Sequence, residues 1–165
     1  NRMKIRIRKY KNNQLAFLEV KKKNKGQTIK TRTPSKSWST SLTTLERQFL
    51  SEIYPKHDSL MSSLENNFIR ITLVNKQKTD RLTFDMNINY TSGSKKMELC
   101  DLVICELKQG KLNRNSLFYL KMREKMIRPF RISKYCMGIM DLYKNEGIKS
   151  NRFKKKKLKL NKILC

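Results

Sequence analysis

Charged and apolar residues alternate along several short segments of this chain, and this period limits its fold more than any other feature. In residues 3–10, Lys4, Arg6, Arg8 and Tyr10 share one face of a strand, opposite the apolar side chains. The same alternation returns in residues 17–23, 28–32, 80–86 and 102–108. Because unpaired buried charges are very costly, such faces need water or a polyanion beside them. A phosphate-rich ligand is therefore the first hypothesis.

The overall charge supports a partner that carries phosphate. The 165 residues include 39 Lys and Arg against 13 Asp and Glu, which gives a formal net charge of +26. Such a field attracts polyanions, so nucleic acid, an anionic membrane surface, a nucleotide and an inorganic phosphate chain all stay open. For any single exposed lysine, a compositional bias towards lysine is an equally good explanation.

Cysteine and histidine usage argues against two kinds of site. The four cysteines form no C-x-x-C pair and no cluster with histidine, which speaks against structural zinc. The single histidine, His57, stands in the polar stretch YPKHDS, so a histidine-dependent triad is not expected. The four cysteines are therefore expected to be reduced thiols, as is usual in a cytoplasmic protein. No apolar run reaches the roughly 18 to 20 residues that a membrane helix requires.

The segments predict one α+β domain over residues 1–165. Strands are expected at residues 3–10, 15–23, 27–33, 67–74, 80–90 and 97–108. Helices are expected from Thr43 to Pro55, at 58–65, at 116–127 after Asn115, and from Ser133. Ionisable strand faces favour an antiparallel β-barrel tunnel with a wide polar interior and flanking helices. The chain enters a strand within two or three residues of Asn1, so its natural start is expected to be missing, and residues 154–165 are expected to form a basic, solvated, partly ordered tail.

Arg6 and Arg8 give the sharpest local signal for anion binding. Guanidinium groups present planar donor forks that match phosphate oxygens, and they stay charged when desolvated. Two arginines spaced by two residues can hold successive phosphates, although an exposed sheet face also carries such pairs. Lys21 and Lys30, on the next two expected strands, add point charges to the same side.

Glu106 is the acidic residue with the largest consequence. It interrupts the apolar run DLVICEL, so its carboxylate is expected to face the polar interior. There it is either a salt-bridge partner or an oxygen ligand for Mg²⁺ or Mn²⁺. Asp85, on the strand that Arg81 opens, can equally pair with a neighbouring cation. Lys134 falls in the first turn of a helix, where free backbone N–H groups attract anions.

Taken in order, six segments resemble the catalytic domain of the vacuolar transporter chaperone family, the VTC domain. They are RIRKY (6–10), FLEVKKK (17–23), TIKTR (28–32), RLTFD (81–85), ICELK (104–108) and ISKYC (132–136). The family belongs to the triphosphate tunnel fold, and its eukaryotic catalytic member makes inorganic polyphosphate from ATP with a divalent metal, usually manganese. The resemblance covers nearly the whole chain, and it implies that the first strand of the barrel is missing here. It implies ATP and polyphosphate as partners and Mn²⁺ or Mg²⁺ as the cofactor.

The resemblance also implies site residues. The positions that resemble the family's catalytic tunnel cations, which bind the nucleotide phosphates and the growing chain, are Arg6, Arg8, Lys21, Lys30, Arg81 and Lys134. Further substrate contacts are expected from Tyr10, Lys76 and Lys108, and metal binding from Glu106. Lys76 stands where the family has a Tyr-Asn/Asp-Arg motif, so it keeps the charge but not the bidentate fork.

These features predict an ATP-dependent polyphosphate polymerase. Phosphoryl transfer depends mainly on positioning and on neutralising the charge of phosphate oxygens, which a basic tunnel with one metal-binding carboxylate can supply. A triphosphate hydrolase, in which water is the nucleophile, and a non-catalytic polyphosphate-binding domain remain alternatives. Binding of nucleic acid is disfavoured because the aromatic residues are not interleaved with the cations in a stacking pattern.

Overall fold

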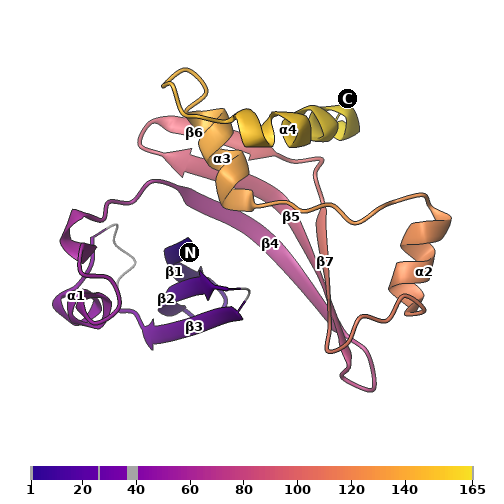
Figure 1. Ribbon diagram of the computed structural model, residues 1–165, viewed down its shortest axis with the longest axis horizontal. Helices are drawn as coiled ribbons and strands as arrows, with labels where there is room; N and C mark the ends of the chain where they lie inside the picture. Colours follow the sequence, from indigo (N-terminus) through magenta and orange to yellow (C-terminus); the bar gives the residue numbers. More distant parts are fainter. Residues whose placement is uncertain (1, 26, 37–40, 165) are drawn as a thin grey trace. The chain divides into compact units, whose positions relative to one another are not determined.

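Figure 1 shows the computed structural model of the chain, which describes residues 2–25, 27–36 and 41–164. It is an α+β protein with antiparallel sheets, and the chain separates after Ser62 into two compact units. The strands form one three-stranded and one four-stranded sheet, and no pairing among the described residues joins the two. The α+β class is therefore confirmed, whereas closure into a barrel stays a prediction. Within the described ranges, no helix has both the length and the hydropathy needed to cross a membrane.

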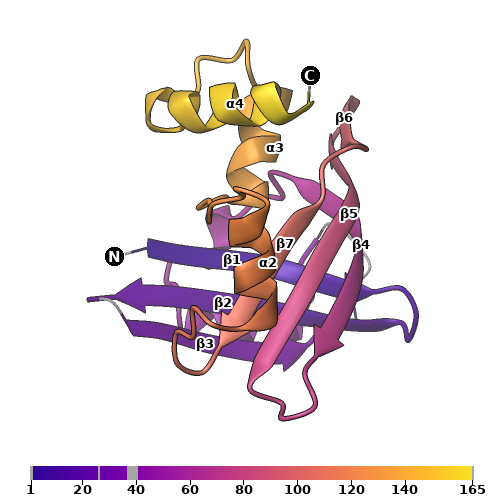
Figure 2. The ribbon, with the colours of Figure 1, turned by 90° about the vertical axis from the view of Figure 1, so that its right-hand side faces the viewer.

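The first unit is a three-stranded antiparallel sheet with one helix. The strands are β1 (Arg2–Tyr10), β2 (Leu15–Asn24) and β3 (Gln27–Pro34), and they pair in that order (Figure 2). This agrees with the strands expected at 3–10, 15–23 and 27–33. The apolar faces of β1 and β2 pack against α1 (Thr44–Ser51). The buried centre of this core is Leu18, Val20 and Leu50.

The helix α1 begins where the sequence predicts it. The Thr43 hydroxyl accepts a hydrogen bond from the Glu46 backbone N–H, and the Glu46 carboxylate accepts one from the Thr43 backbone N–H. The second helix, expected at 58–65, is wrong. Only the 3₁₀ turn η1 (His57–Ser59) forms. Leu60 packs in the core of the first unit and Leu64 in that of the second, and the segment between them has no helical structure.

The second unit is built on one long central strand. The strand β5 (Asp80–Ser92) pairs with β4 (Glu65–Val74) on one edge, and with both β6 (Lys95–Leu99) and β7 (Ile104–Gln109) on the other. The single strand expected at 97–108 is therefore wrong. Leu99 and Leu102 are both buried, and this spacing of three breaks the period of two, so the chain turns between them.

Three helices complete the second unit: α2 (Leu117–Glu124), α3 (Lys134–Leu142) and α4 (Asn151–Leu164). The N-cap of α2 is Ser116 and not Asn115, whereas Ser133 caps α3 as expected. The basic tail expected to be partly ordered is largely the helix α4, which lies beside α3 in Figures 1 and 2. It forms because Leu160 is buried in the core of this unit, which the tail's charge run does not reveal.

Gly138 lets α3 approach β5 closely. A Cβ atom at this position would lie 2.5 Å from Cδ1 of Tyr90 and 2.8 Å from a methyl carbon of Leu64. Such separations are too short for non-bonded carbon atoms, whose optimum is about 3.5 to 4.0 Å. The tight fit fixes the position of α3, which begins at Lys134.

Candidate functional site

The first unit gathers cations on one face of its sheet. Strand register places Arg6 opposite Glu19, and Lys21 opposite both Lys4 and Lys30. Residues directly opposite one another in an antiparallel sheet point to the same side. The structure therefore brings together five of the residues predicted from the sequence: Arg6, Arg8, Tyr10, Lys21 and Lys30.

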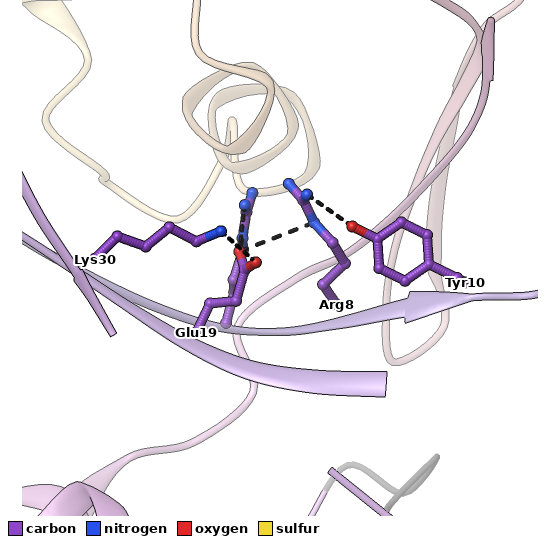
Figure 3. A network of polar contacts seen from close by, with 5 residues as sticks. Arg8, Tyr10, Glu19 and Lys30 are labelled. Carbon is purple, nitrogen blue, oxygen red and sulfur yellow. Dashed lines mark hydrogen bonds and ion pairs between the residues drawn. The ribbon is translucent and has the colours of Figure 1, made fainter. Parts of the chain in front are cut away.

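Glu19 is the centre of this cation cluster. Its side chain is 2% exposed and accepts hydrogen bonds from Nε and Nη2 of Arg6, at 2.9 and 2.6 Å. The Lys30 ammonium lies 3.0 Å from the other carboxylate oxygen, and Nε of Arg8 lies 3.9 Å away (Figure 3). The alternation pattern placed Glu19 on this face, but gave no sign that it is buried beneath several cations.

The electrostatics of Glu19 follow from two opposing effects. Burial raises the pKa of its carboxyl group, but the hydrogen bonds from Arg6 and Lys30 and the nearby positive charges lower it to about 2. The carboxylate therefore stays ionised at neutral pH and neutralises part of the surrounding charge. It holds the cations in place when no anion is bound.

Lys21 and Arg8 complete this cluster of cations. Burial and, after it, the positive charge of Arg6 lower the pKa of the Lys21 ammonium, while the Glu19 carboxylate acts in the opposite direction. Nη1 of Arg8 donates to the Tyr10 hydroxyl at 3.1 Å, and the guanidinium also lies 5.8 Å from the centre of the tyrosine ring (Figure 3). Tyr10 thus fixes the orientation of the Arg8 donor fork.

The second unit holds a similar cluster around Asp85. This aspartate is 1% exposed and receives a bidentate contact from Arg70, with Nε to Oδ1 at 2.5 Å and Nη2 to Oδ2 at 2.7 Å. Lys134, in the first turn of α3, forms a second ion pair with the same carboxylate. Burial raises the pKa of Asp85, but the hydrogen bonds from Arg70 and Lys134 outweigh it and hold the pKa below its usual value.

Arg70 was missed from the sequence. It interrupts the apolar segment FIRITL on β4, and that alternation is the signal that could have found it. Phe68 lies on the same face, and both cations contact its ring: the Arg70 guanidinium at 5.2 Å and the Lys134 ammonium at 4.9 Å from the ring centre. The pairing of Asp85 with a cation, which the sequence left open, is the one found.

The remaining predicted residues lie on the sheet that carries Asp85 or on the β4–β5 turn beside it. Arg81 is opposite Lys108 and Thr83 is opposite Glu106, so these side chains continue the polar face of β5 and β7. Arg81 and Lys108 also line a shallow depression near the β4–β5 turn. Lys76 is an exposed residue of that turn.

Of the two roles predicted for Glu106, salt-bridge partner and metal ligand, the side chains around it account for the first. Its side chain is 51% exposed, and the ammonium of Lys108 lies 3.6 Å from Oε1, so it is a loose salt-bridge partner. In the described part of the chain, no three His, Cys, Asp or Glu side chains are grouped to hold a metal ion. Binding of Mn²⁺ or Mg²⁺ at Glu106 would therefore need phosphate oxygens as additional ligands, as is usual for Mg²⁺.

The buried carboxylate of Glu19 predicts a stability that depends on acid pH. A carboxylate whose pKa is lower in the folded state stabilises that state above its unfolded pKa of about 4.5 and loses this effect as the pH falls towards about 2. We expect the free energy of unfolding to fall by on the order of 3 kcal/mol across this window through Glu19. Urea denaturation at a series of pH values measures it, and Glu19→Gln should flatten the curve there. An unchanged slope in the variant would contradict the assignment.

Comparison with known protein families finds a match for this chain. The family model of the VTC domain matches residues 1–143, which include every strand and the helix that carries Lys134. No curated protein and no solved structure matches the chain. Since the match covers most of the 165 residues, the chain belongs to the VTC domain family.

Proposed function

We propose that this chain is an ATP-dependent polyphosphate polymerase domain, which transfers the terminal phosphate of ATP to a growing inorganic polyphosphate chain. Membership of the VTC domain family supports a polyphosphate-related function in general. The observation that carries the finer proposal is the pair of clusters in which a buried carboxylate orders several cations, Glu19 in one sheet and Asp85 in the other. The proposal includes closure of the strands into the tunnel that the family resemblance implies.

In the proposed reaction the protein binds and orients the phosphates and forms no covalent bond with them. Arg6 and Arg8 would hold phosphate oxygens through their donor forks, and Lys21 would add a point charge. Pre-ordered donors of this kind stabilise the charge that develops on oxygen atoms during phosphoryl transfer. A terminal oxygen of the chain would attack the γ-phosphorus of ATP without a strong base. The new P–O bond would form as the bond to the β-phosphate oxygen breaks, and ADP would leave. A divalent ion bound by Glu106 and substrate oxygens would neutralise further charge.

Arg81, Lys108 and Lys134 would extend the phosphate-binding surface on the second sheet. Arg81 and Lys108 are opposite one another on neighbouring strands, and Lys134 reaches the same polar face from a helix N-terminus. Lys76, on the adjacent turn, would add charge where substrate approaches this sheet. The location proposed for the reaction is the cytoplasm, where ATP is the phosphate donor.

Synthesis of phosphate chains by the full chain, with ATP and Mn²⁺, tests the proposal. We expect Glu106→Gln to reduce synthesis by about 100-fold, because the amide removes a negative metal ligand. Glu98→Gln, which changes another exposed acid of the same unit, is the matched control and should keep wild-type activity. The products are resolved by gel electrophoresis, and the release of free phosphate is measured in parallel.

The other outcomes separate the alternative functions. Free phosphate without chains would show a triphosphate hydrolase, since the same cations can bind a triphosphate while water attacks it. Tight binding of polyphosphate without any turnover would show a non-catalytic binding domain. Wild-type synthesis by Glu106→Gln would remove Glu106 from the proposed metal site while leaving the polymerase assignment in place.

A further inference from the structure

The helix α4 carries a dense group of cations and no acidic residue. Its sequence is NRFKKKKLKLNKIL, and it begins beyond residue 143, where the match to the VTC domain ends. None of its lysines belongs to the strand-face clusters around Glu19 and Asp85. The charge of this helix therefore calls for an explanation of its own.

One side of α4 is anchored to the second unit. Leu160 is 7% exposed and belongs to the core that also contains Tyr90 and Met137. Lys157, on the same side, forms an ion pair with Asp141 of α3. These contacts fix the rotation of the helix about its axis, so the opposite side is presented to solvent.

The exposed side of α4 is a lysine face, by which we mean Lys154, Lys155, Lys159 and Lys162. An α-helix advances about 1.5 Å and 100° per residue, so Lys155, Lys159 and Lys162 follow one stripe about 10 Å long. Like charges at these spacings destabilise a helix. A bound polyanion would remove that repulsion, which makes the lysine face suited to a ligand with closely spaced negative charges.

The surroundings of the lysine face distinguish between polyanions. Phe153 is half-buried with the Lys156 ammonium 5.5 Å from its ring centre, and Phe130 is covered by Lys159, so neither ring is open for stacking on bases. Leu158, which is 55% exposed, is an isolated apolar side chain among the lysines of residues 154–162. A helix that enters a membrane surface needs a continuous apolar face, and here the opposite side is packed in the core.

We propose that the lysine face of α4 is a surface binding site for the inorganic phosphate polymer, in addition to the cations of the strand faces. This inference rests on the proposed function, which makes such a polymer the substrate and product. Lysine ammonium groups bind phosphates as point charges without a fixed geometry. They suit a long flexible polymer, whose many weak contacts add up, better than a single short phosphate group.

Binding of a long polyphosphate and of tripolyphosphate by the full chain tests the proposal. We compare the wild type with Lys154→Gln, Lys155→Gln, Lys162→Gln, a triple variant that leaves the Lys159 contact with Phe130 intact. The matched control changes three exposed lysines of the same unit, Lys96→Gln, Lys125→Gln and Lys144→Gln. A third variant with arginine at the three α4 positions keeps the charge.

We expect the α4 glutamine variant to bind long polyphosphate about tenfold more weakly. The slope of log K against log salt concentration should become less steep by about two, which corresponds to the loss of three contacts with a single-stranded polyanion. The matched control and the arginine variant should bind like the wild type. Affinity for tripolyphosphate should be unchanged throughout, because the strand-face cations are intact. Helical circular dichroism confirms that each variant is folded.

Four results would overturn the proposal. Equal loss in the α4 variant and the matched control would mean that only net charge matters. Unchanged polymer binding, combined with a loss of binding to single-stranded RNA or to anionic lipid vesicles, would assign the lysine face to that partner. A wild type that binds tripolyphosphate but not the long polymer would remove the α4 site alone, whereas failure to bind either would also remove the proposed function.

Discussion

Replacing Arg6 with methionine is expected to lower the free energy of unfolding by about 3 kcal/mol and polyphosphate synthesis by about 100-fold. The loss of stability follows because Nε and Nη2 of Arg6 donate hydrogen bonds to the buried carboxylate of Glu19, and methionine cannot donate them. Removing one partner of a buried ion pair leaves the charge of the other uncompensated. The loss of synthesis follows because Arg6 is also a proposed donor to phosphate oxygens. Urea denaturation and a chain-synthesis assay measure the two effects separately.

The double variant Arg6→Met, Glu19→Met separates the two roles of Arg6. Removing the carboxylate as well removes the unpaired charge, so most of the lost stability should return. Synthesis should stay low, because the guanidinium that binds phosphate is still absent. If the double variant recovers both stability and synthesis, Arg6 only balances Glu19, and its proposed contact with phosphate is wrong.

Replacing Arg70 with lysine is expected to reduce polyphosphate synthesis by tenfold or more, while the free energy of unfolding falls by only about 1 to 2 kcal/mol. Lysine keeps the positive charge beside Asp85 but cannot make the bidentate contact of Nε and Nη2. The Asp85 carboxylate would then shift, and Lys134, its other partner, would shift with it. Arg70→Met, which also removes the charge, should lower both quantities further.

Arg128→Lys is the matched control for Arg70→Lys. Arg128 is an exposed loop residue of the same unit, so its replacement by lysine should change neither stability nor synthesis. Activity at the wild-type level in both Arg70 variants would show that the cluster around Asp85 maintains the fold and has no part in phosphate binding.

Period-two patterning was sufficient for the strands of the first unit. Lys4, Arg6 and Arg8 alternate strictly with apolar residues, so both the strand and its cationic face could be predicted. The pattern cannot give the register between strands, and register decides which charges meet. That Glu19 lies between Arg6 and Lys30 depends on which residues β2 places opposite its neighbours, and the period does not contain this information.

The elements predicted wrongly are those whose apolar residues pack in a core formed by residues far away in the sequence. Leu60 and Leu64 have a helical spacing but pack in different units, and Leu99 and Leu102 are buried on either side of a turn. Leu160, among the lysines of α4, likewise reaches a core formed by residues far from it in sequence. Such contacts override local pattern, because the burial of one large side chain stabilises the fold by about 1.5 to 3 kcal/mol.

Gly138 has a consequence for the charges as well as for the packing. The ring of Tyr90 occupies the space that a side chain at this position would need, so even a methyl group would push α3 away from β5. Lys134 stands at the first residue of that helix and pairs with Asp85 on that strand. The contact between Gly138 and Tyr90, one helical turn from Lys134, therefore determines how closely the Lys134 ammonium approaches Asp85. A substitution that changes no charged residue can therefore shift the cations of the proposed phosphate-binding face.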